Sequence, residues 1–124
     1  MRLTYLYISV FAAGMLAITA CSCNNNKQAD KPVIIKGLYS FGPEVKSIRE
    51  CGHENEFWVT DSSAQLELQY SQLNFEKPYE PVYIEVEGIK KPSDKVGLGS
   101  DFDTTLVVHK LIKITKEIPL ETCR

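Results

Sequence analysis

The chain begins with a run of apolar positions that no charged residue interrupts. This run covers residues 5–20, and Arg2 places one positive charge before it. The run ends in small residues directly before Cys21. A positive start, an apolar run and small residues before a cysteine are typical of a bacterial secretory signal with a lipoprotein processing site. We therefore expect residues 1–20 to be a signal peptide and Cys21 to become the lipidated first residue of the mature chain.

An N-terminal transmembrane anchor that is never cut is the alternative. The apolar run is marginal in length for crossing a bilayer, and the cysteine at its boundary favours cleavage. After the cysteine, the segment up to residue 32 is polar and contains no aromatic or branched apolar side chain. Such a composition predicts that residues 21–32 form a flexible tether. With either anchor, the rest of the chain is held at a membrane outside the cytoplasm.

From residue 33 onward, β-forming side chains gather in runs that turn residues separate. The predicted strands span residues 33–40, 44–51, 57–60, 82–88 and 104–116, and alternation is cleanest in the fourth. The apolar set of the last strand comprises Leu106, Val108, Ile112 and Ile114. Because Val107 and Leu111 break this alternation, we predict a β-bulge near His109 or burial on both faces.

Between the third and fourth strands the period of the apolar positions changes. Leu66, Tyr70 and Leu73 fall at helical spacing. Ser62 precedes Gln65 at the spacing of a capping box, which predicts a helix of about three turns that ends near residue 74. One helix between strands three and four of a five-stranded antiparallel meander is the outline of an OB-fold. We therefore predict a mainly β, OB-fold-like barrel over residues 33–124, with an α+β sandwich as the alternative.

The charge balance narrows the possible partners. The chain has 14 Lys and Arg against 16 Asp and Glu, a formal net charge of −2, and shows no basic stripe. This balance does not favour nucleic acid as a partner. Attachment to a membrane is therefore expected to depend on acyl chains such as palmitate at Cys21, and several chains anchor a protein stably where one does not.

The four cysteines have different expected fates. With Cys21 assigned to the lipid, Cys51 and Cys123 lie in the folded part of an exported chain, where an oxidising compartment favours pairing. We predict a disulfide between them, which would stabilise the domain by about 4 kcal/mol in the chain-entropy model. Cys23 lies in the tether and is either free or paired between molecules.

Residues 37–52 read Gly-Leu-Tyr-Ser-Phe-Gly-Pro-Glu-Val-Lys-Ser-Ile-Arg-Glu-Cys-Gly, followed by Phe57-Trp58-Val59. This segment resembles the C-terminal OB domain of NlpE-type envelope lipoproteins, or a stand-alone relative, and the likeness extends over residues 37–123. The resemblance implies an OB-fold and a place in the bacterial envelope. NlpE-type proteins also carry an N-terminal barrel with a Cys-x-x-Cys motif. Since this sequence shows no counterpart, copper or adhesion sensing through that barrel is not implied.

Motifs for catalysis are absent from the sequence. It contains no nucleophile elbow, phosphate-binding loop or His-Glu-x-x-His, and its two histidines lie in a turn (His53) and on a strand (His109). We therefore expect no enzymatic activity and no cofactor. The rival hypothesis is a metal-handling or envelope-stress-sensing lipoprotein, in which Cys51, His53 and Cys123 would bind Cu(I) or Zn. A disulfide between the two cysteines competes directly with this ligand set.

Aromatic side chains offer the best candidate for a recognition surface. Stacking faces on a barrel suit peptides or sugars, and we expect Tyr39, Trp58 and Tyr83, together with Phe41 and Tyr79, to form such a surface. Tyr83 lies out of phase with its apolar neighbours on the fourth strand, which predicts exposure. The expected function is a non-catalytic binding or structural module at the periplasmic side of the outer membrane, with an envelope protein or a glycan as partner.

Overall fold

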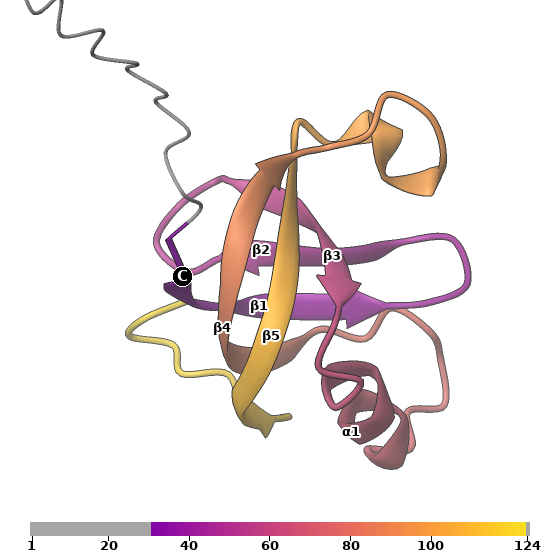
Figure 1. Ribbon diagram of the computed structural model, residues 1–124. Coiled ribbons are helices and arrows are strands. Elements are labelled where there is room, and N and C mark those ends of the chain that lie inside the picture. The colour runs from indigo at the N-terminus through magenta and orange to yellow at the C-terminus, as the bar shows by residue number, and fades with distance from the viewer. Residues whose placement is uncertain (1–30, 124) are drawn as a thin grey trace, which may run out of the picture.

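Five strands close into a barrel in the part of the chain that the computed structural model describes, residues 31–123. Neighbouring strands follow the order β1-β2-β3-β5-β4, and β4 returns to β1 (Figure 1). The elements are β1 (Val33–Phe41), β2 (Lys46–Glu50), β3 (Glu56–Asp61), α1 (Leu66–Gln72), β4 (Val82–Pro92), the 3₁₀-helix η1 (Leu98–Asp101) and β5 (Thr104–Thr115). A five-stranded barrel with one α-helix between β3 and β4 confirms the predicted OB-fold.

The residues expected to attach the chain to a membrane lie outside the described part. These are the predicted signal peptide over residues 1–20, the lipidated Cys21, Cys23 and most of the tether. Within residues 31–123, no helix has the length and apolarity needed to cross a bilayer.

Closure of the barrel depends on one parallel pair of strands. β3 runs parallel to β5, from Trp58 opposite Thr105 to Asp61 opposite Val108, whereas the other neighbours are antiparallel. The expected meander of antiparallel strands is wrong at this point. After β3 the chain passes through α1 at one end of the barrel, so β4 pairs with β1 and β5 fills the remaining gap (Figure 1).

The barrel interior holds the apolar core. Alternate residues of each strand point inward, as the pleat requires, and α1 adds two side chains at the end of the barrel. The buried cluster consists of Ile35, Tyr39, Ile48, Phe57, Val59, Leu66, Tyr70, Val82, Ile84, Val86, Leu106 and Val108. The clean alternation of the fourth predicted strand therefore identifies the residues of β4 that point into the barrel.

Two β-bulges interrupt the pairing of β5 with β4. The register skips His109 and then Ile112. The first bulge confirms the one predicted from the broken alternation, and the second was not foreseen. Because each extra residue reverses the side on which the following side chains lie, Val108 and Leu111 both pack with the core. Ile112 is 45% exposed, so its assignment to the core is wrong.

Helix α1 is shorter than predicted, and a different residue stabilises its start. The N-cap residue makes no side-chain hydrogen bond. Asp61, at the end of β3, accepts hydrogen bonds from the backbone N–H of Ser63 (3.0 Å) and of Glu67 (3.1 Å). The capping box predicted at Ser62 is wrong. The backbone N–H groups at the start of the helix are bonded by the Asp61 carboxylate and not by the Ser62 hydroxyl.

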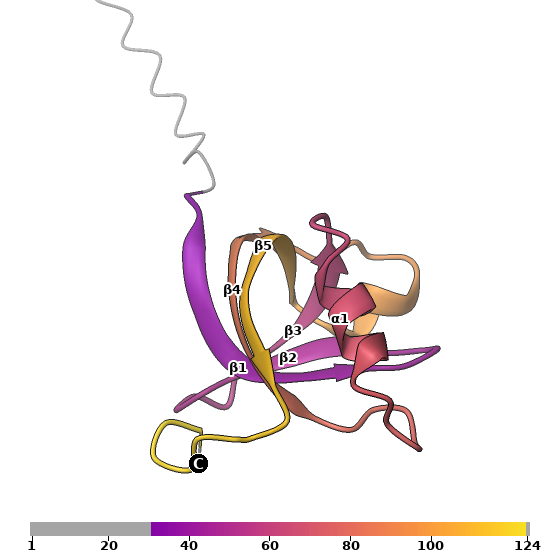
Figure 2. The ribbon, with the colours of Figure 1, turned by 90° about the horizontal axis from the view of Figure 1, so that it is seen from below.

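A disulfide joins the C-terminal segment to the turn after β2. Cys51 lies in the turn after β2 and is bonded to Cys123, with the two Cα atoms 4.3 Å apart and 72 residues apart in sequence. Figure 2 shows the C-terminal segment curling back beside that turn. The bond predicted from the cysteine count is thus present.

Candidate functional site

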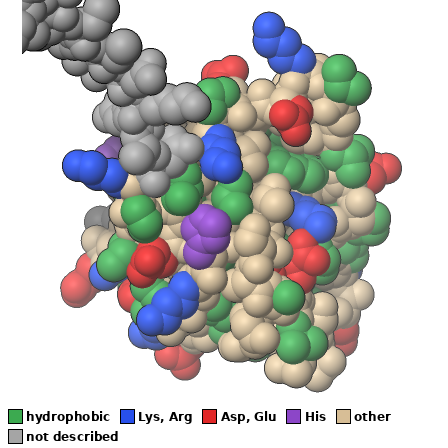
Figure 3. Space-filling view, viewed as in Figure 1, with side chains coloured by type: hydrophobic (Ala, Val, Ile, Leu, Met, Phe, Trp, Pro, Cys, Tyr) green, Lys and Arg blue, Asp and Glu red, His purple; other side chains and the backbone are tan. Residues whose placement is uncertain are grey.

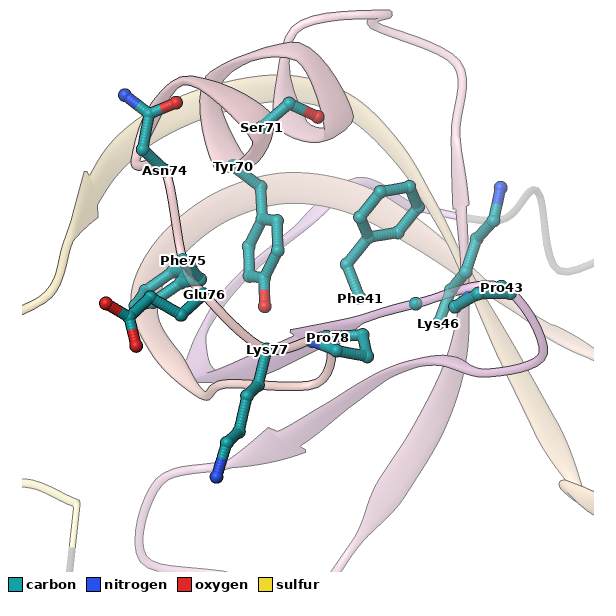
Figure 4. A pocket seen from close by; sticks show the side chains of 11 residues that line it. Phe41, Pro43, Lys46, Tyr70, Ser71, Asn74, Phe75, Glu76, Lys77 and Pro78 are labelled. Carbon is teal, nitrogen blue, oxygen red and sulfur yellow. The ribbon is translucent and has the colours of Figure 1, made fainter.

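A groove opens between α1, the β1–β2 loop and the segment that leads from α1 to β4 (Figure 4). Its volume is about 670 Å³, within the usual range for ligand pockets. The residues that line it are Phe41, Gly42, Pro43, Lys46, Tyr70, Ser71, Asn74, Phe75, Glu76, Lys77 and Pro78. Two stretches that are distant in sequence, residues 41–46 and 70–78, therefore meet at one surface.

Aromatic rings form the floor of the groove. The ring of Tyr70 lies 5.5 Å from that of Phe41 in an edge contact, and 5.3 Å from that of Phe75 at a tilt of 40°. Tyr70 also meets Tyr39 of the core edge-on at 5.7 Å. The floor is thus continuous with the barrel core, and such an apolar, rigid surface favours burial of another apolar side chain.

Tyr79 fixes one wall of the groove. Its backbone N–H donates to the carbonyl of Phe41 (3.0 Å), and its hydroxyl oxygen accepts from the N–H of Glu44 (3.1 Å). Two residues of the segment between α1 and β4, Asn74 and Tyr79, have positive φ angles of 53° and 67°. For tyrosine this conformation costs about 1–2 kcal/mol, so the wall persists because its hydrogen bonds hold it in place.

The mouth of the groove carries charges of both signs. Lys46 Nζ lies 2.6 Å from Glu67 Oε1 and 5.5 Å from the ring centroid of Phe41. Both partners of the ion pair remain about one-third exposed, so the pair adds little stability but positions the ammonium group at the rim. Lys77 and Glu76 are exposed on the opposite side. A ligand here meets an apolar floor and a polar rim.

Tyr70 is an uncharged side chain in the floor of the groove. Its hydroxyl donates to the carbonyl oxygen of Glu80 at 2.7 Å. Burial raises the pKa of Tyr70 above its ordinary value. The side chain is therefore protonated at physiological pH, and its hydroxyl proton is donated to the Glu80 carbonyl.

Tyr39 is not part of a recognition surface. It is fully buried, and its hydroxyl makes no hydrogen bond with any residue in the described range. Burial, followed by the nearby carboxylates of Glu67 and Asp61, raises its pKa far above the ordinary value. The predicted exposure is wrong because Tyr39 shares the inward face of β1 with Ile35.

Tyr83 is also buried, contrary to the expectation from the alternation on its strand. It points to the outer side of β4, but the chain after β5 folds back beside it, and residues 117–119 line a small cavity with it. Its hydroxyl donates to Glu85 Oε1 at 2.7 Å. Burial and this bond raise the pKa of Tyr83 to about 12. The same bond, supported by Lys36 and Lys113, lowers the pKa of Glu85.

Trp58, unlike Tyr39 and Tyr83, stays partly exposed. Its ring lies 5.8 Å from that of Phe102 in the β4–β5 loop. Gly99 of that loop packs so closely that a Cβ atom there would lie 2.9 Å from the indole. The loop therefore covers part of the face on which OB-folds usually bind ligands.

The alternative metal site at Cys51, His53 and Cys123 is not available in this structure. The two sulfur atoms are bonded to each other, so neither is a thiolate ligand. His53 is exposed, with Nδ1 3.2 Å from the carbonyl oxygen of Cys51. Among residues 31–123, no three His, Cys, Asp or Glu side chains are placed to hold a metal ion.

The sequence alone did not identify the groove. The sequence pattern includes Phe41 and Tyr79 among the candidate recognition aromatics, but it gives no role to Phe75 and does not bring these residues together. One local signal points to the groove. Phe75 is an aromatic residue between the turn-forming Asn74 and Pro78, where no neighbour in sequence can cover it, so it must pack against a distant segment or a ligand.

Comparison with known proteins supports the fold. No solved structure matches the chain at a significant level. The yeast protein "Decapping and exoribonuclease protein 1" (Saccharomyces cerevisiae) is 33% identical over 97 residues, which is 78% of this chain and 19% of the yeast protein. The chain thus spans about a fifth of the length of that relative. The family model described as "NlpE C-terminal OB domain" matches residues 29–124, so the chain belongs to the family of the NlpE C-terminal OB domain.

Proposed function

We propose that this protein is a lipid-anchored component of the bacterial cell envelope that binds a partner without catalysis. Its family is associated with the envelope. The apolar leader that ends at Cys21 supports anchoring by acyl chains on that residue. The groove between α1 and the β1–β2 loop is the observation that carries the binding function.

The groove suits an apolar side chain of another envelope protein. The ring of Tyr70 lies at 75° to that of Phe41 and at 40° to that of Phe75, so the floor is an uneven apolar surface that favours an inserted side chain over a flat sugar ring. Polar groups at the rim, Lys46, Ser71 and Asn74, lie where the backbone of an extended segment would pass. An anchored glycan remains the second partner to test.

The groove chemistry favours binding over catalysis. A hydrolytic site needs a nucleophile within hydrogen-bond reach of a base. The Ser71 hydroxyl instead donates to the backbone carbonyl of Glu67 at 2.8 Å, and the Tyr70 hydroxyl donates to that of Glu80. Both hydroxyl groups are therefore structural donors in this protein.

The charge pattern of the chain does not favour RNA as its partner. The formal net charge is −2, and acidic and basic side chains intermingle on the face seen in Figure 3. Proteins that bind nucleic acid ordinarily concentrate lysine and arginine on one face.

Anchoring is tested by metabolic labelling with an alkyne analogue of palmitate. We expect the wild-type protein to carry the label and to fractionate with membranes, and Cys21→Ala to lose both properties. Cys23→Ala is the matched control, because it removes a neighbouring thiol and should keep the label. Equal labelling of Cys21→Ala and wild type would refute the proposed anchor.

Binding is tested by placing the photo-crosslinking residue p-benzoylphenylalanine at Phe75, inside the groove, in intact cells. We expect a discrete crosslinked species that disappears when Phe41→Ala is added in the groove floor. Leu120 is 71% exposed but does not line the groove, so the same probe at this position is the control. Identical products from both positions would contradict a role for the groove.

A further inference from the structure

The loop between β4 and β5, residues 93–103, displays two apolar side chains to solvent. Val96 is 87% exposed and Leu98 is 64% exposed. The upper right of Figure 3, where Figure 1 places this loop, shows hydrophobic side chains at the surface next to charged ones. Exposed branched apolar side chains at a loop tip indicate a contact that the isolated domain does not make.

The loop is held in this form by its own bonds. The backbone N–H and the hydroxyl of Ser100 both donate to the carbonyl of Gly97, at 3.1 and 2.7 Å. Phe102 N–H donates to the carbonyl of Gly99, and Gly99 lies against the Trp58 ring. These contacts hold the loop against β3. Val96 and Leu98 border a small cavity beside Trp58 and still remain largely exposed.

The tether joins the barrel at the end from which this loop projects. Val33, the first residue of β1, pairs with Gly88 of β4, and β4 then continues to Pro92, where the loop begins. Val33 and Ile34 are themselves exposed. Helix α1, which lines the groove, lies at the opposite end of the barrel (Figure 1).

The tether is short enough to keep this end of the barrel near a bilayer. Between Cys21 and Val33 a fully extended chain spans about 40 Å. A lipid at Cys21 therefore confines the loop to a thin layer above the membrane. At the resulting effective concentration, on the order of millimolar, even a weak affinity for the surface leads to contact.

We propose that Val96 and Leu98 insert into the interfacial layer of the same bilayer that holds the lipid anchor. This inference rests on the proposed lipidation of Cys21. Insertion orients the barrel with the β4–β5 loop on the membrane and with α1 and the groove turned toward the periplasmic space. The lipid and the loop tip together form two attachment points, which restrict the rotation that a single flexible tether allows.

The charges around the loop determine the kind of contact. Residues 90–103 contain three basic and three acidic side chains, Lys90, Lys91, Lys95, Asp94, Asp101 and Asp103. With no net charge, the contact depends on burial of apolar surface and not on attraction to anionic headgroups. It should therefore persist at high salt, unlike a contact made by a polybasic segment.

Trp58 provides a native probe for this contact. It is the only tryptophan of the chain and lies directly beneath the loop, against Gly99. The native lipoprotein is reconstituted into phosphatidylethanolamine–phosphatidylglycerol vesicles whose acyl chains are either brominated or unmodified, since bromine quenches nearby indoles. We expect strong quenching in the brominated vesicles at low and at high salt. The double variant Val96→Asp/Leu98→Asp should lose most of it.

Leu68→Asp is the matched control. Leu68 is also an exposed apolar residue, but it lies on α1 at the opposite end of the barrel, so its replacement should leave the quenching unchanged. Equal quenching of wild type and the double variant, or no quenching of wild type in vesicles, would overturn the proposed contact.

Flotation of the same vesicles separates this inference from the proposed anchor. Wild-type protein that floats with the vesicles but shows no quenching is anchored without the loop contact. Protein that fails to float refutes both the anchor and the inference. A contact of the loop with a protein partner instead of lipid predicts no quenching of anchored wild type in pure lipid vesicles, which overturns the inference.

Discussion

The aromatic ring of Tyr79 lies directly over the Cα atom of Gly42, so that a Cβ atom at position 42 would overlap the ring. The same tyrosine donates its backbone N–H to the carbonyl of Phe41 and accepts from the N–H of Glu44. The β1–β2 loop and the segment before β4 are thus joined at one point. This contact sets the position of two walls of the groove.

Replacement of Gly42 by alanine should destabilise the domain by about 1–3 kcal/mol, because the methyl group forces the Tyr79 ring or the loop to move. Chemical denaturation measures this loss. The double variant Gly42→Ala/Tyr79→Ala should be more stable than the sum of the single losses predicts, since the second change removes the overlap. Additive losses would show that the ring and the glycine do not interact.

Removal of the Tyr39 hydroxyl should leave stability unchanged or increase it by about 1 kcal/mol, because this buried group has no hydrogen-bond partner among residues 31–123. Thermal unfolding of Tyr39→Phe tests this. Tyr70→Phe is the matched comparison. It deletes the bond to the Glu80 carbonyl and should cost about 1 kcal/mol. A loss of the same size in both variants would contradict the assignment.

Local patterns in the sequence were sufficient to predict most of the elements. Val82, Ile84 and Val86 alternate with polar or aromatic residues, and all three are buried on one side of β4. The broken alternation near His109 corresponds to a bulge. These features depend on neighbours a few residues away, so the chain itself carries the information.

Features that depend on distant segments were not predictable. The parallel pairing of β3 with β5 has no local signal, because it requires the chain to pass through α1 and β4 first. Tyr83 is buried by residues that follow β5, which no pattern on β4 reveals. Tyr39 shows the same limit, because the face of β1 that points into the barrel depends on how all five strands pair.

The groove illustrates this limit for function. Phe41 and Phe75 belong to different elements and approach each other only through Tyr70. The sequence pattern predicts a surface of Tyr39, Phe41, Trp58, Tyr79 and Tyr83. Of these residues, only Phe41 lines the groove. A binding surface assembled from two stretches that are distant in sequence has no motif of its own, so its position had to come from the structure.

Loss of the disulfide should reduce the stability of the domain by about 4 kcal/mol, because the bond closes a segment with a sequence separation of 72 residues. Total stabilities are about 5–15 kcal/mol, so this is a large share. Denaturation of Cys51→Ser/Cys123→Ser measures the loss. Wild type under reducing conditions should behave like the variant, and reductant should have no effect on the variant itself. A variant as stable as oxidised wild type would contradict this account.

The bond from Tyr83 to Glu85 should make stability depend on pH in the acidic range. It lowers the pKa of Glu85 in the folded state below the ordinary value of 4.5. The stabilisation is therefore complete above about pH 4.5 and is lost as the pH falls through the lowered pKa. Glu85→Gln should unfold at lower denaturant concentration than wild type at pH 7, and the difference should shrink toward pH 3.

Tyr83→Phe is the control for this pH dependence. It removes the hydrogen-bond donor and leaves the carboxylate with Lys36, 3.7 Å away. In the Tyr83→Phe background, Glu85→Gln should change the pH dependence of stability between pH 7 and pH 3 less than it does in wild type. An unchanged difference would assign the effect to the lysine and not to the tyrosine.

The start of α1 offers a direct comparison between the two residues that could stabilise it. Asp61→Ala removes the carboxylate that accepts from the N–H groups of Ser63 and Glu67 and should cost about 1–2 kcal/mol in chemical denaturation. Ser62→Ala removes the hydroxyl to which the sequence pattern assigns the same role. Because no hydrogen bond of the Ser62 side chain occurs in the structure of residues 31–123, its loss should stay within about 0.5 kcal/mol. If Ser62→Ala causes the larger loss of stability, the Ser62 hydroxyl caps the helix as the sequence pattern predicts, and the hydrogen bonds of Asp61 do not stabilise its start.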